Sequence, residues 1–533
     1  MAPDWRGDPR AAAAEASLRD AAAVIASLPR RIDAVPARGA ARAPTDRALE
    51  EGTRTWSYAE LEAAVALAAD ALTRAGVRAG DRVLVVGENC AALVMLLFAI
   101  ARLDAWTVPV NARLSDREIG AIRDHCTPRR ALYLVANSQD AAQHATRDGA
   151  AESLSIATAG DVRMTALAGR EAEPADGEAV AALLYTTGTT GEPKGVMLTH
   201  RNLLFIAKVS STLRLLDAAD RVYGVLPISH VYGLASVCLG TLFAGACLVL
   251  EPRYSPAGLA QALRERGLSV VQGVPAMYAK LVDHLDAHAE PLSAPRLRFL
   301  YAGGSPLDPA LKSAVEARTG HPLHNGYGLT EAAPTVTQTR LDLPRADCSV
   351  GPPIPGVEIR LVDAQGRDVA AGGVGELLVR GPNVMRGYYR NAEITAKTID
   401  AGGWLHTGDL ARAGDDGALA IVGRAKELII RSGFNVHPAE VEAVLNAHPA
   451  VRQSAVVGRD VPGNEEVVAF IELADGAQAT GADLLAFAAQ HLAPYKRPAE
   501  IVILPRLPVA ATGKVLKQRL RTQAQAMRTA PER

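Results

Sequence analysis

Short apolar runs that alternate with helical stretches constrain the fold of this chain most strongly. Runs of this kind lie at 82–87, 106–110, 268–274 and 297–304. Alternation of strand-like and helical patterns is typical of parallel sheets covered by helices. We therefore expect an α/β protein with largely parallel sheets over most of its length.

The pattern changes in the C-terminal third of the chain. From about 350 to 422, short strand-like segments separated by Gly, Pro and Asp turns predict a small β-barrel. After residue 426 the pattern is α+β, with helices expected near 438–447 and 482–491. The 533 residues suit several compact units. We expect a large N-terminal domain over 1–425, barrel included, and a small mobile C-terminal domain over 426–533.

Composition excludes several classes of protein. A net charge of −1 without a basic run argues against a nucleic-acid surface. The five cysteines are scattered without a C-x-x-C pair, so we expect reduced thiols in a cytoplasmic protein. The N-terminus has no sustained apolar stretch, which argues against a signal peptide. The uncharged run 231–250 is interrupted by three glycines and predicts a buried helix, a turn and a strand, with no membrane span.

The segment YTTGTTGEPKG at 185–195 points to chemistry. Glycines let backbone N–H groups approach an anion, threonine hydroxyls add donors, and Lys194 adds positive charge. The spacing differs from a Walker loop, and no Ser or Thr follows the lysine. A flexible surface loop is the alternative, but we interpret the segment as a triphosphate-binding loop.

Four further segments follow in order along the chain. They are NGYGLTEAAP at 325–334, GWLHTGDLAR at 403–412, GRAKELIIRSGFNVHPAEVE at 423–442 and LPVAATGKVLKQRLR at 507–521. With the phosphate loop, the set resembles the adenylate-forming superfamily of acyl-CoA synthetases, 4-coumarate–CoA ligases, luciferases and peptide-synthetase adenylation domains. The resemblance extends from about residue 20 to about 525.

The resemblance implies roles for individual residues in binding ATP. The phosphate loop would hold the β- and γ-phosphates through Thr186, Thr187, Gly188, Thr189, Thr190, Gly191 and Lys194. The adenine would lie against Gly303, Gly304, Ser305, Asn325, Gly326, Tyr327 and Gly328. Thr330 would contact the α-phosphate and Glu331 would bind Mg²⁺, a cation that prefers carboxylate oxygen. Asp409 and Arg424 would bind the ribose, although an ordinary turn aspartate is the alternative for Asp409.

Lysine is scarce in this chain, with nine lysines among 57 basic residues. Three of them fall at positions where the family uses lysine: Lys194, Lys426 and Lys514. Lys514 matches the lysine that stabilises the transition state of adenylation. Lys426 matches the hinge about which the C-terminal domain turns between the two half-reactions. After that rotation Gly433 and Phe434 would line the side on which coenzyme A enters.

Residues for the acyl pocket follow from the same resemblance. They are His230, Val231, Tyr232, Gly303, Gly328, Pro334 and Thr335. His230 would gate the acyl tunnel, with a purely structural histidine as the alternative. No Arg or Lys in these segments pairs obviously with a second carboxylate, so we expect an uncharged acyl group.

The resulting expectation is an ATP-dependent acyl-CoA synthetase. The enzyme would form an acyl-adenylate with release of pyrophosphate and then transfer the acyl group to coenzyme A, without a covalent acyl-enzyme. A stand-alone adenylating enzyme that loads a carrier protein is the second hypothesis, and a non-catalytic nucleotide-binding relative is the third. The acid (aromatic, cinnamic-type or medium-chain fatty) and the oligomeric state, a homodimer included, stay open.

Overall fold

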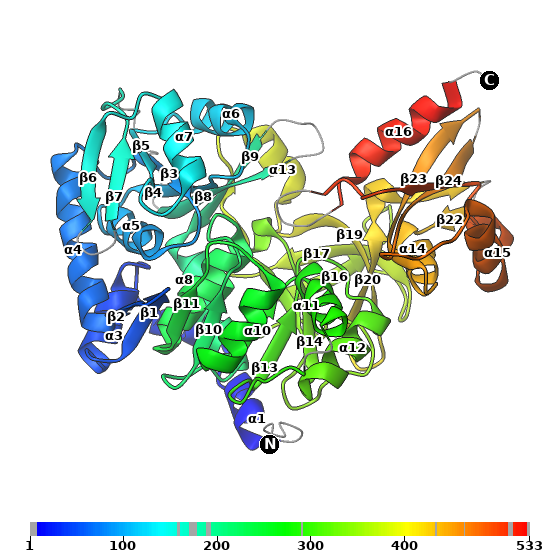
Figure 1. Ribbon diagram of the computed structural model, residues 1–533, viewed down its shortest axis with the longest axis horizontal. Coiled ribbons are helices and arrows are strands. Elements are labelled where there is room, and N and C mark those ends of the chain that lie inside the picture. Colours follow the sequence, from blue (N-terminus) through cyan, green and yellow to red (C-terminus); the bar gives the residue numbers. More distant parts are fainter. Residues whose placement is uncertain are drawn as a thin grey trace. The chain divides into compact units, whose positions relative to one another are not determined.

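A computed structural model describes residues 8–156, 160–169, 179–187, 193–288, 291–431, 434–462, 464–509 and 515–529. Helices pack around several sheets (Figure 1). The chain forms two compact units. Unit 1 comprises Met1–Gly304, Ser313–Ile359 and Val379–Leu405; unit 2 comprises Ser305–Lys312, Arg360–Leu378 and His406–Arg533. The predicted domain boundary after residue 425 stays a prediction.

The first sheet of unit 1 has eight strands in the order β15-β14-β13-β12-β10-β11-β1-β2. Their bounds are β1 (Arg47–Glu51), β2 (Arg54–Ser57), β10 (Arg221–Gly224), β11 (Cys247–Leu250), β12 (Val270–Gly273), β13 (Phe299–Ala302), β14 (Leu323–Gly328) and β15 (Thr335–Gln338). The six inner strands run parallel, and the two edge strands β15 and β2 pair antiparallel.

The second sheet of unit 1 also has eight strands, in the order β18-β9-β8-β4-β3-β5-β7-β6. Their bounds are β3 (Arg82–Gly87), β4 (Trp106–Asn111), β5 (Arg130–Tyr133), β6 (Glu152–Ile156), β7 (Gly160–Met164), β8 (Val180–Thr187), β9 (Pro193–Thr199) and β18 (Gly387–Tyr388). The centre, β8-β4-β3-β5, is parallel. The apolar runs at 82–87 and 106–110 are its fully or nearly fully buried neighbours β3 and β4, as predicted.

Helices of unit 1 cover and separate these sheets. They are α1 (Pro9–Ala16), α2 (Ala21–Ser27), α3 (Ala34–Arg42), α4 (Tyr58–Arg74), α5 (Ala91–Arg102), α6 (Asp116–Cys126), α7 (Gln139–Arg147), α8 (His200–Leu213), η1 (Tyr232–Leu239), α9 (Gly240–Ala244), α10 (Pro256–Glu265), α11 (Pro275–Ala287), η2 (Thr330–Ala332) and α13 (Ala392–Thr398); α12 (Pro309–Thr319) runs from unit 2 into unit 1. Helix α5 is apolar on every face and contacts β1 of one sheet and β3 and β4 of the other.

The uncharged stretch 231–250 folds as predicted. It forms the buried helices η1 and α9, a turn in which Gly245 has a φ of 86°, and strand β11. A residue with a side chain is strained at this φ, which explains the glycine. Across the described ranges, no helix is long and apolar enough to cross a membrane.

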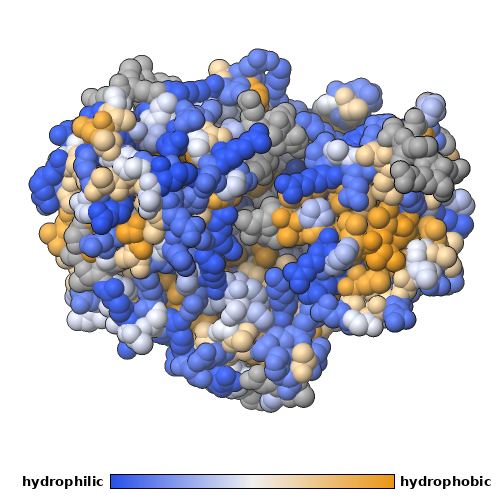
Figure 2. All heavy atoms as spheres, turned by 45° about the horizontal axis from the view of Figure 1, so that its top comes forward, coloured by the Kyte–Doolittle hydropathy of each residue, from blue (hydrophilic) through white to orange (hydrophobic). Residues whose placement is uncertain are grey.

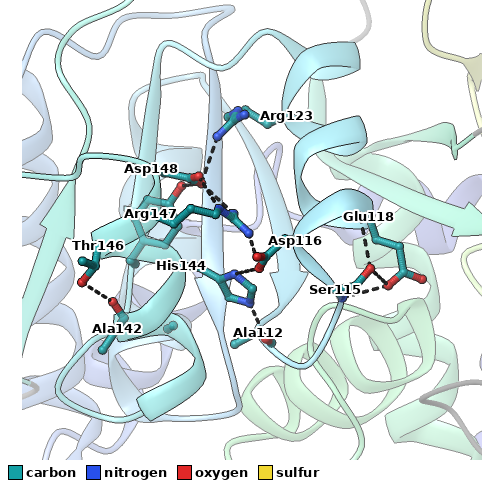
Figure 3. A network of polar contacts seen from close by, with 12 residues as sticks. Ala112, Ser115, Asp116, Glu118, Arg123, Ala142, His144, Thr146, Arg147 and Asp148 are labelled. Carbon is teal, nitrogen blue, oxygen red and sulfur yellow. Dashed lines mark hydrogen bonds and ion pairs between the residues drawn. The ribbon is translucent and has the colours of Figure 1, made fainter.

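A network of ion pairs ties α6 and α7 to the second sheet (Figure 3). The buried carboxylate of Asp148, just beyond α7, lies 3.0 Å from Arg123 Nη1 and 2.8 Å from Arg147 Nε. Tyr133 of β5 donates a 2.5 Å hydrogen bond to the same carboxylate. Burial alone would raise the pKa of Asp148, but these partners outweigh burial and lower the pKa to about 2.

The described residues of unit 2 form three sheets. Its elements are β16 (Glu358–Val362), β17 (Val374–Arg380), β19 (Leu405–Ala413), β20 (Leu419–Arg424), η3 (Ala425–Glu427), β21 (Ile429–Arg431), β22 (Phe434–Val436), α14 (Pro438–Asn446), β23 (Val451–Val461), β24 (Asn464–Leu473), α15 (Gly481–His491), η4 (Pro494–Lys496), β25 (Glu500–Leu504) and α16 (Lys517–Thr529), with β16, β17 and β19 each running across the border to unit 1. The stretch predicted as a barrel forms the four-stranded sheet β16-β17-β19-β20. Helices α14 and α15 confirm the two predicted helices.

Strand β24 contributes side chains to both hydrophobic clusters of unit 2. Val467, Ala469 and Ile471 pack with residues of α14 and α15, while Val468 and Phe470 face α16. This alternation with a period of two gives the sheet β23-β24-β25 one apolar core on each face. In Figure 1, α16 (red) runs beside β23. The face drawn in Figure 2 is mostly hydrophilic, with hydrophobic residues gathered at the right of the view.

Candidate active site

The predicted phosphate loop connects two antiparallel strands of unit 1. The end of β8 pairs with the start of β9, so that Thr186 lies opposite Lys194 and Thr187 opposite Pro193. Strand β8 therefore leads directly into the segment 185–195. Four of the predicted loop residues, Gly188, Thr189, Thr190 and Gly191, lie outside the described residues.

Tyr388 connects this hairpin to Glu331. Strand β18 pairs antiparallel with β9, which places Tyr388 opposite Val196. The centre of the Tyr388 ring lies 5.6 Å from Lys194 Nζ. Its hydroxyl donates a 2.8 Å hydrogen bond to Glu331 Oε1. Burial and the charge of Glu331 raise the pKa of Tyr388, so the phenol keeps its proton and remains a donor.

Glu331 is held by its backbone as well as by its side chain. It lies in η2, and its carbonyl oxygen accepts a 2.8 Å hydrogen bond from the backbone N–H of Met385. Its second carboxylate oxygen, Oε2, accepts no hydrogen bond from the described residues. Mg²⁺ prefers oxygen ligands and is commonly held by one or two carboxylates plus substrate phosphates and water. A single carboxylate with a free oxygen fits that requirement.

The predicted adenine residues lie where β13 and β14 end side by side. A Cβ added to Gly326 would lie 1.8 Å from the Tyr301 hydroxyl, and one added to Gly328 would lie 2.2 Å from the Pro334 carbonyl oxygen. Neither position has room for a side chain. Asn325 Nδ2 donates to the Cys348 carbonyl over 2.9 Å, so this amide also fixes the segment around residue 348.

The predicted acyl-pocket residues lie at the start of η1 and at the ends of β13, β14 and β15, all in unit 1. His230 Nδ1 accepts a 3.3 Å hydrogen bond from the Tyr232 backbone, which leaves the proton of the neutral ring on Nε2. Val231 and Tyr232 are buried. Thr335 of β15 reaches the same region, because its Oγ1 lies 3.4 Å from Oγ of Ser236 in η1.

The remaining predicted residues belong to unit 2. Asp409 in β19 and Arg424 in β20 are cross-strand neighbours, with 2.9 Å between Arg424 Nε and Asp409 Oδ1. Ser305 lies in the short segment 305–312 of the same unit. Lys426 lies in η3, next to Glu427, whose carboxylate is 3.1 Å from Lys517 Nζ.

Phe434 is 54% exposed and stacks on Tyr495 with 4.6 Å between ring centres. Tyr495 is partly buried against the core that α14 and α15 share, so Phe434 is the exposed member of the pair. Gly433 and Lys514 lie outside the described residues.

Comparison with known proteins places this arrangement in a family. The model of the AMP-binding enzyme family matches residues 37–389, and that of the AMP-binding enzyme C-terminal domain matches residues 440–514. This chain belongs to the AMP-binding enzyme family. The predicted resemblance to adenylate-forming enzymes is thereby confirmed.

Individual members of the family are similar over nearly the whole chain. Feruloyl-CoA synthase of Amycolatopsis sp is 36% identical over 91% of this chain and 97% of its own. 4-Coumarate–CoA ligase 3 of Oryza sativa subsp. japonica is 32% identical over 89% of this chain and 88% of its own. The structure of O-succinylbenzoate coenzyme A synthetase from Bacillus subtilis, in complex with ATP and magnesium ion, is 28% identical and aligns with a TM-score of 0.78 over 92% of this chain and 98% of its own.

These relatives are CoA ligases, and this family member is an AMP-forming acid–thiol ligase of the acyl-CoA synthetase class, as predicted. The α/β fold with a large N-terminal and a smaller C-terminal part is confirmed as well. Tyr388 is the site residue that the sequence did not reveal, because the run Gly387-Tyr388-Tyr389 carries no spacing signal of its own. The roles of the individual residues stay predictions.

Proposed function

We propose that this protein activates an aromatic acid of the hydroxycinnamic type with ATP and Mg²⁺ and transfers it to coenzyme A. The contact of Tyr388 with both Glu331 and Lys194 is the observation that carries the proposal, because it joins a carboxylate and a cation suited to a magnesium triphosphate. The aromatic acid class is supported by the substrates that the two sequence relatives are named for.

Adenylation depends on charge neutralisation and positioning. The acid carboxylate attacks the α-phosphorus, and the bond to pyrophosphate breaks. Lys194, with the hydroxyls of Thr186 and Thr187, binds the leaving phosphates, and Thr330 binds the α-phosphate. Mg²⁺ supplies charge neutralisation at the phosphates when it is bound to Glu331. Lys514 stabilises the negative charge that develops around the α-phosphorus.

The nucleoside is held by hydrogen bonds and close backbone packing. Asp409, an acceptor when ionised, binds the ribose hydroxyls, and Arg424 fixes its carboxylate. Gly326 and Gly328 bring the backbone close to the adenine ring because neither position has room for a side chain.

Thiol transfer follows without an acyl-enzyme. All five cysteines are free, and burial raises the pKa of Cys90, Cys126 and Cys238 to about 12 and that of Cys247 to about 11. Thiols of this kind do not form the thiolate that a nucleophile needs. We infer that the thiolate of coenzyme A attacks the acyl-adenylate directly and releases AMP. Lys426 serves as the hinge between the half-reactions.

We place the enzyme in the cytoplasm, where free thiols stay reduced.

A panel of acids tests the proposal. The purified protein is incubated with ATP, Mg²⁺ and one acid, with and without coenzyme A, and AMP and pyrophosphate are measured. We expect 4-coumarate and ferulate to exceed octanoate by at least tenfold in kcat/KM, and we expect AMP release to need coenzyme A. Equal or greater turnover of octanoate would overturn the acid class. A carrier-protein thiol that replaces coenzyme A would overturn the second half-reaction.

A further inference from the structure

Arg214 is a fully buried arginine whose guanidinium contacts amide oxygens. It caps the C-terminal end of α8 and is 0% exposed. Its Nε donates to Gln338 Oε1 over 3.1 Å, and its Nη1 donates to Gln272 Oε1 over 2.7 Å. The guanidinium carbon lies 4.6 Å from the ring centre of Tyr301. No carboxylate of the described residues forms an ion pair with it, although arginine keeps its charge in proteins.

Three buried polar groups around this arginine have no hydrogen-bond partner in the described part of the chain. They are Arg214 Nη2, Gln272 Nε2 and the hydroxyl of Tyr232. Gln272 is oriented by its bond to Arg214, because its oxygen accepts there and its NH₂ group is left over. Tyr232 packs edge-on against Tyr301 with 6.1 Å between ring centres. Native proteins leave few such groups unsatisfied, so we take these three as candidates for contact with a ligand.

The chemistry of the cluster selects the kind of ligand. Arg214 Nη2 and Gln272 Nε2 only donate hydrogen bonds, and the Tyr232 hydroxyl donates as well as accepts. One of the donors belongs to a guanidinium group, which is positively charged. An oxygen atom that accepts hydrogen bonds, neutral or anionic, is the complementary group.

The cluster adjoins the residues assigned to the acyl group. Tyr232 is one of them. A Cβ added to Gly303 would lie 3.5 Å from the Tyr232 ring and 3.3 Å from the Tyr301 ring, so both rings lie against the Gly303 backbone. Gln338, which binds Arg214, ends the strand β15 that Thr335 begins. The acyl-pocket segments themselves contain no basic residue, and the fold brings Arg214 to them from α8.

We propose that Arg214, Gln272 and Tyr232 form a subsite for an oxygen substituent on the acyl group, remote from the carboxylate that is adenylated. The inference rests on the proposed function and assigns residues to the recognition of the oxygen that such acids carry away from their carboxylate. Ring methoxy or hydroxyl groups and a second carboxylate share this chemistry. An acid of the same shape without the oxygen leaves the three donors unsatisfied and is rejected.

Three acids of similar shape test the subsite: 4-methoxycinnamate, 4-carboxycinnamate and 4-ethylcinnamate. The readout is kcat/KM for acid-dependent exchange of pyrophosphate into ATP. We expect the wild-type enzyme to prefer one of the two oxygen-bearing acids over 4-ethylcinnamate by on the order of 100-fold. Preference for the methoxy acid identifies a neutral acceptor, and preference for the carboxy acid identifies an anion.

Variants test whether the preference for an oxygen-bearing acid depends on Tyr232 and Arg214. The quantity compared is the ratio of kcat/KM for the preferred oxygen-bearing acid to kcat/KM for 4-ethylcinnamate. Tyr232→Phe removes one unpartnered hydroxyl and should lower this ratio about tenfold. Arg214→Gln should bring the ratio close to one. Tyr278→Phe is the matched control, because its hydroxyl already bonds to the carbonyls of Val271 and Tyr301, and its ratio should not change. If Arg214→Gln fails to fold, the ratio measured for the wild-type enzyme and for Tyr232→Phe still tests the subsite.

Equal turnover of the three acids, or a ratio that Tyr232→Phe leaves unchanged, overturns the subsite while the proposed function stands. A protein that exchanges pyrophosphate with no aromatic acid overturns both.

Discussion

The hydroxyl of Tyr388 donates a 2.8 Å hydrogen bond to the carboxylate of Glu331, across 57 positions of the chain. The same ring lies beside Lys194. A carboxylate oriented in this way presents its second oxygen in one direction, which favours a fixed cation position. We therefore propose Tyr388 as a positioning residue that acts through Glu331.

Tyr388→Phe should slow adenylation roughly 10- to 100-fold, because it removes a hydrogen bond to a charged group. It should also raise the Mg²⁺ concentration needed for half-maximal pyrophosphate exchange, a change that a purely structural residue would not cause. Tyr254→Phe is the control, since it removes one phenol hydrogen bond, to the Met277 carbonyl, elsewhere in unit 1. An unchanged Mg²⁺ requirement in Tyr388→Phe would contradict the assignment.

Asp409→Asn should raise the KM for ATP about tenfold, because the neutral amide is a weaker partner for Arg424 and for ribose hydroxyls. The rate at saturating ATP should change much less. Initial rates of pyrophosphate exchange over a range of ATP concentrations measure both quantities. Asp415→Asn, on the exposed turn between β19 and β20, should behave like the wild type. An equal KM in the two variants would rule out the ribose contact.

Lys514→Ala should reduce adenylation on the order of 10²- to 10³-fold. Thioester formation from supplied acyl-adenylate and coenzyme A should persist, because the lysine serves the first transition state only. Single-turnover measurements of each half-reaction separate the two effects. A similar loss in both half-reactions would argue for a structural lysine instead.

Lys426→Pro should have the opposite effect. Proline fixes φ near −65° and cannot absorb a large backbone rotation, so acyl-adenylate should form while transfer to coenzyme A fails. Lys426→Ala removes the same side chain but keeps the backbone free, and it should complete both steps. Normal thioester formation by a well-folded Lys426→Pro protein would refute the hinge.

Asp148→Asn should lower the free energy of unfolding by roughly 2 kcal/mol at pH 7, because the pKa of Asp148 lies at about 2 and its ordinary value is 3.8. A lowered pKa contributes stability that is complete above the unfolded value and disappears as the pH falls through the folded value. The gap between variant and wild type should therefore shrink to about half at pH 3. Urea unfolding at both pH values measures it. Asp161→Asn, exposed on β7, is the control, and a gap independent of pH would contradict the ion-pair account.

Short sequence patterns predicted those elements whose structure depends mainly on neighbouring residues in the chain. Strand β3 was readable because a run of apolar residues that is buried on both faces has few other uses, and Lys194 was readable because its loop has a distinctive composition. Tyr388 and Arg214 were not readable. Each acquires its role from partners that are remote in sequence, Glu331 for one and Gln272 for the other. Such pairs follow from sheet order and helix packing, which no short segment encodes.

The burial of four cysteines has a practical consequence for optical experiments. Cys348 is the one partly exposed thiol of the five, and its carbonyl accepts the hydrogen bond from Asn325. A maleimide dye should therefore label the natural chain at a single position, without prior removal of other cysteines. A fluorophore on Cys348 would lie next to Asn325, a residue of the proposed adenine site, and would report nucleotide binding in real time.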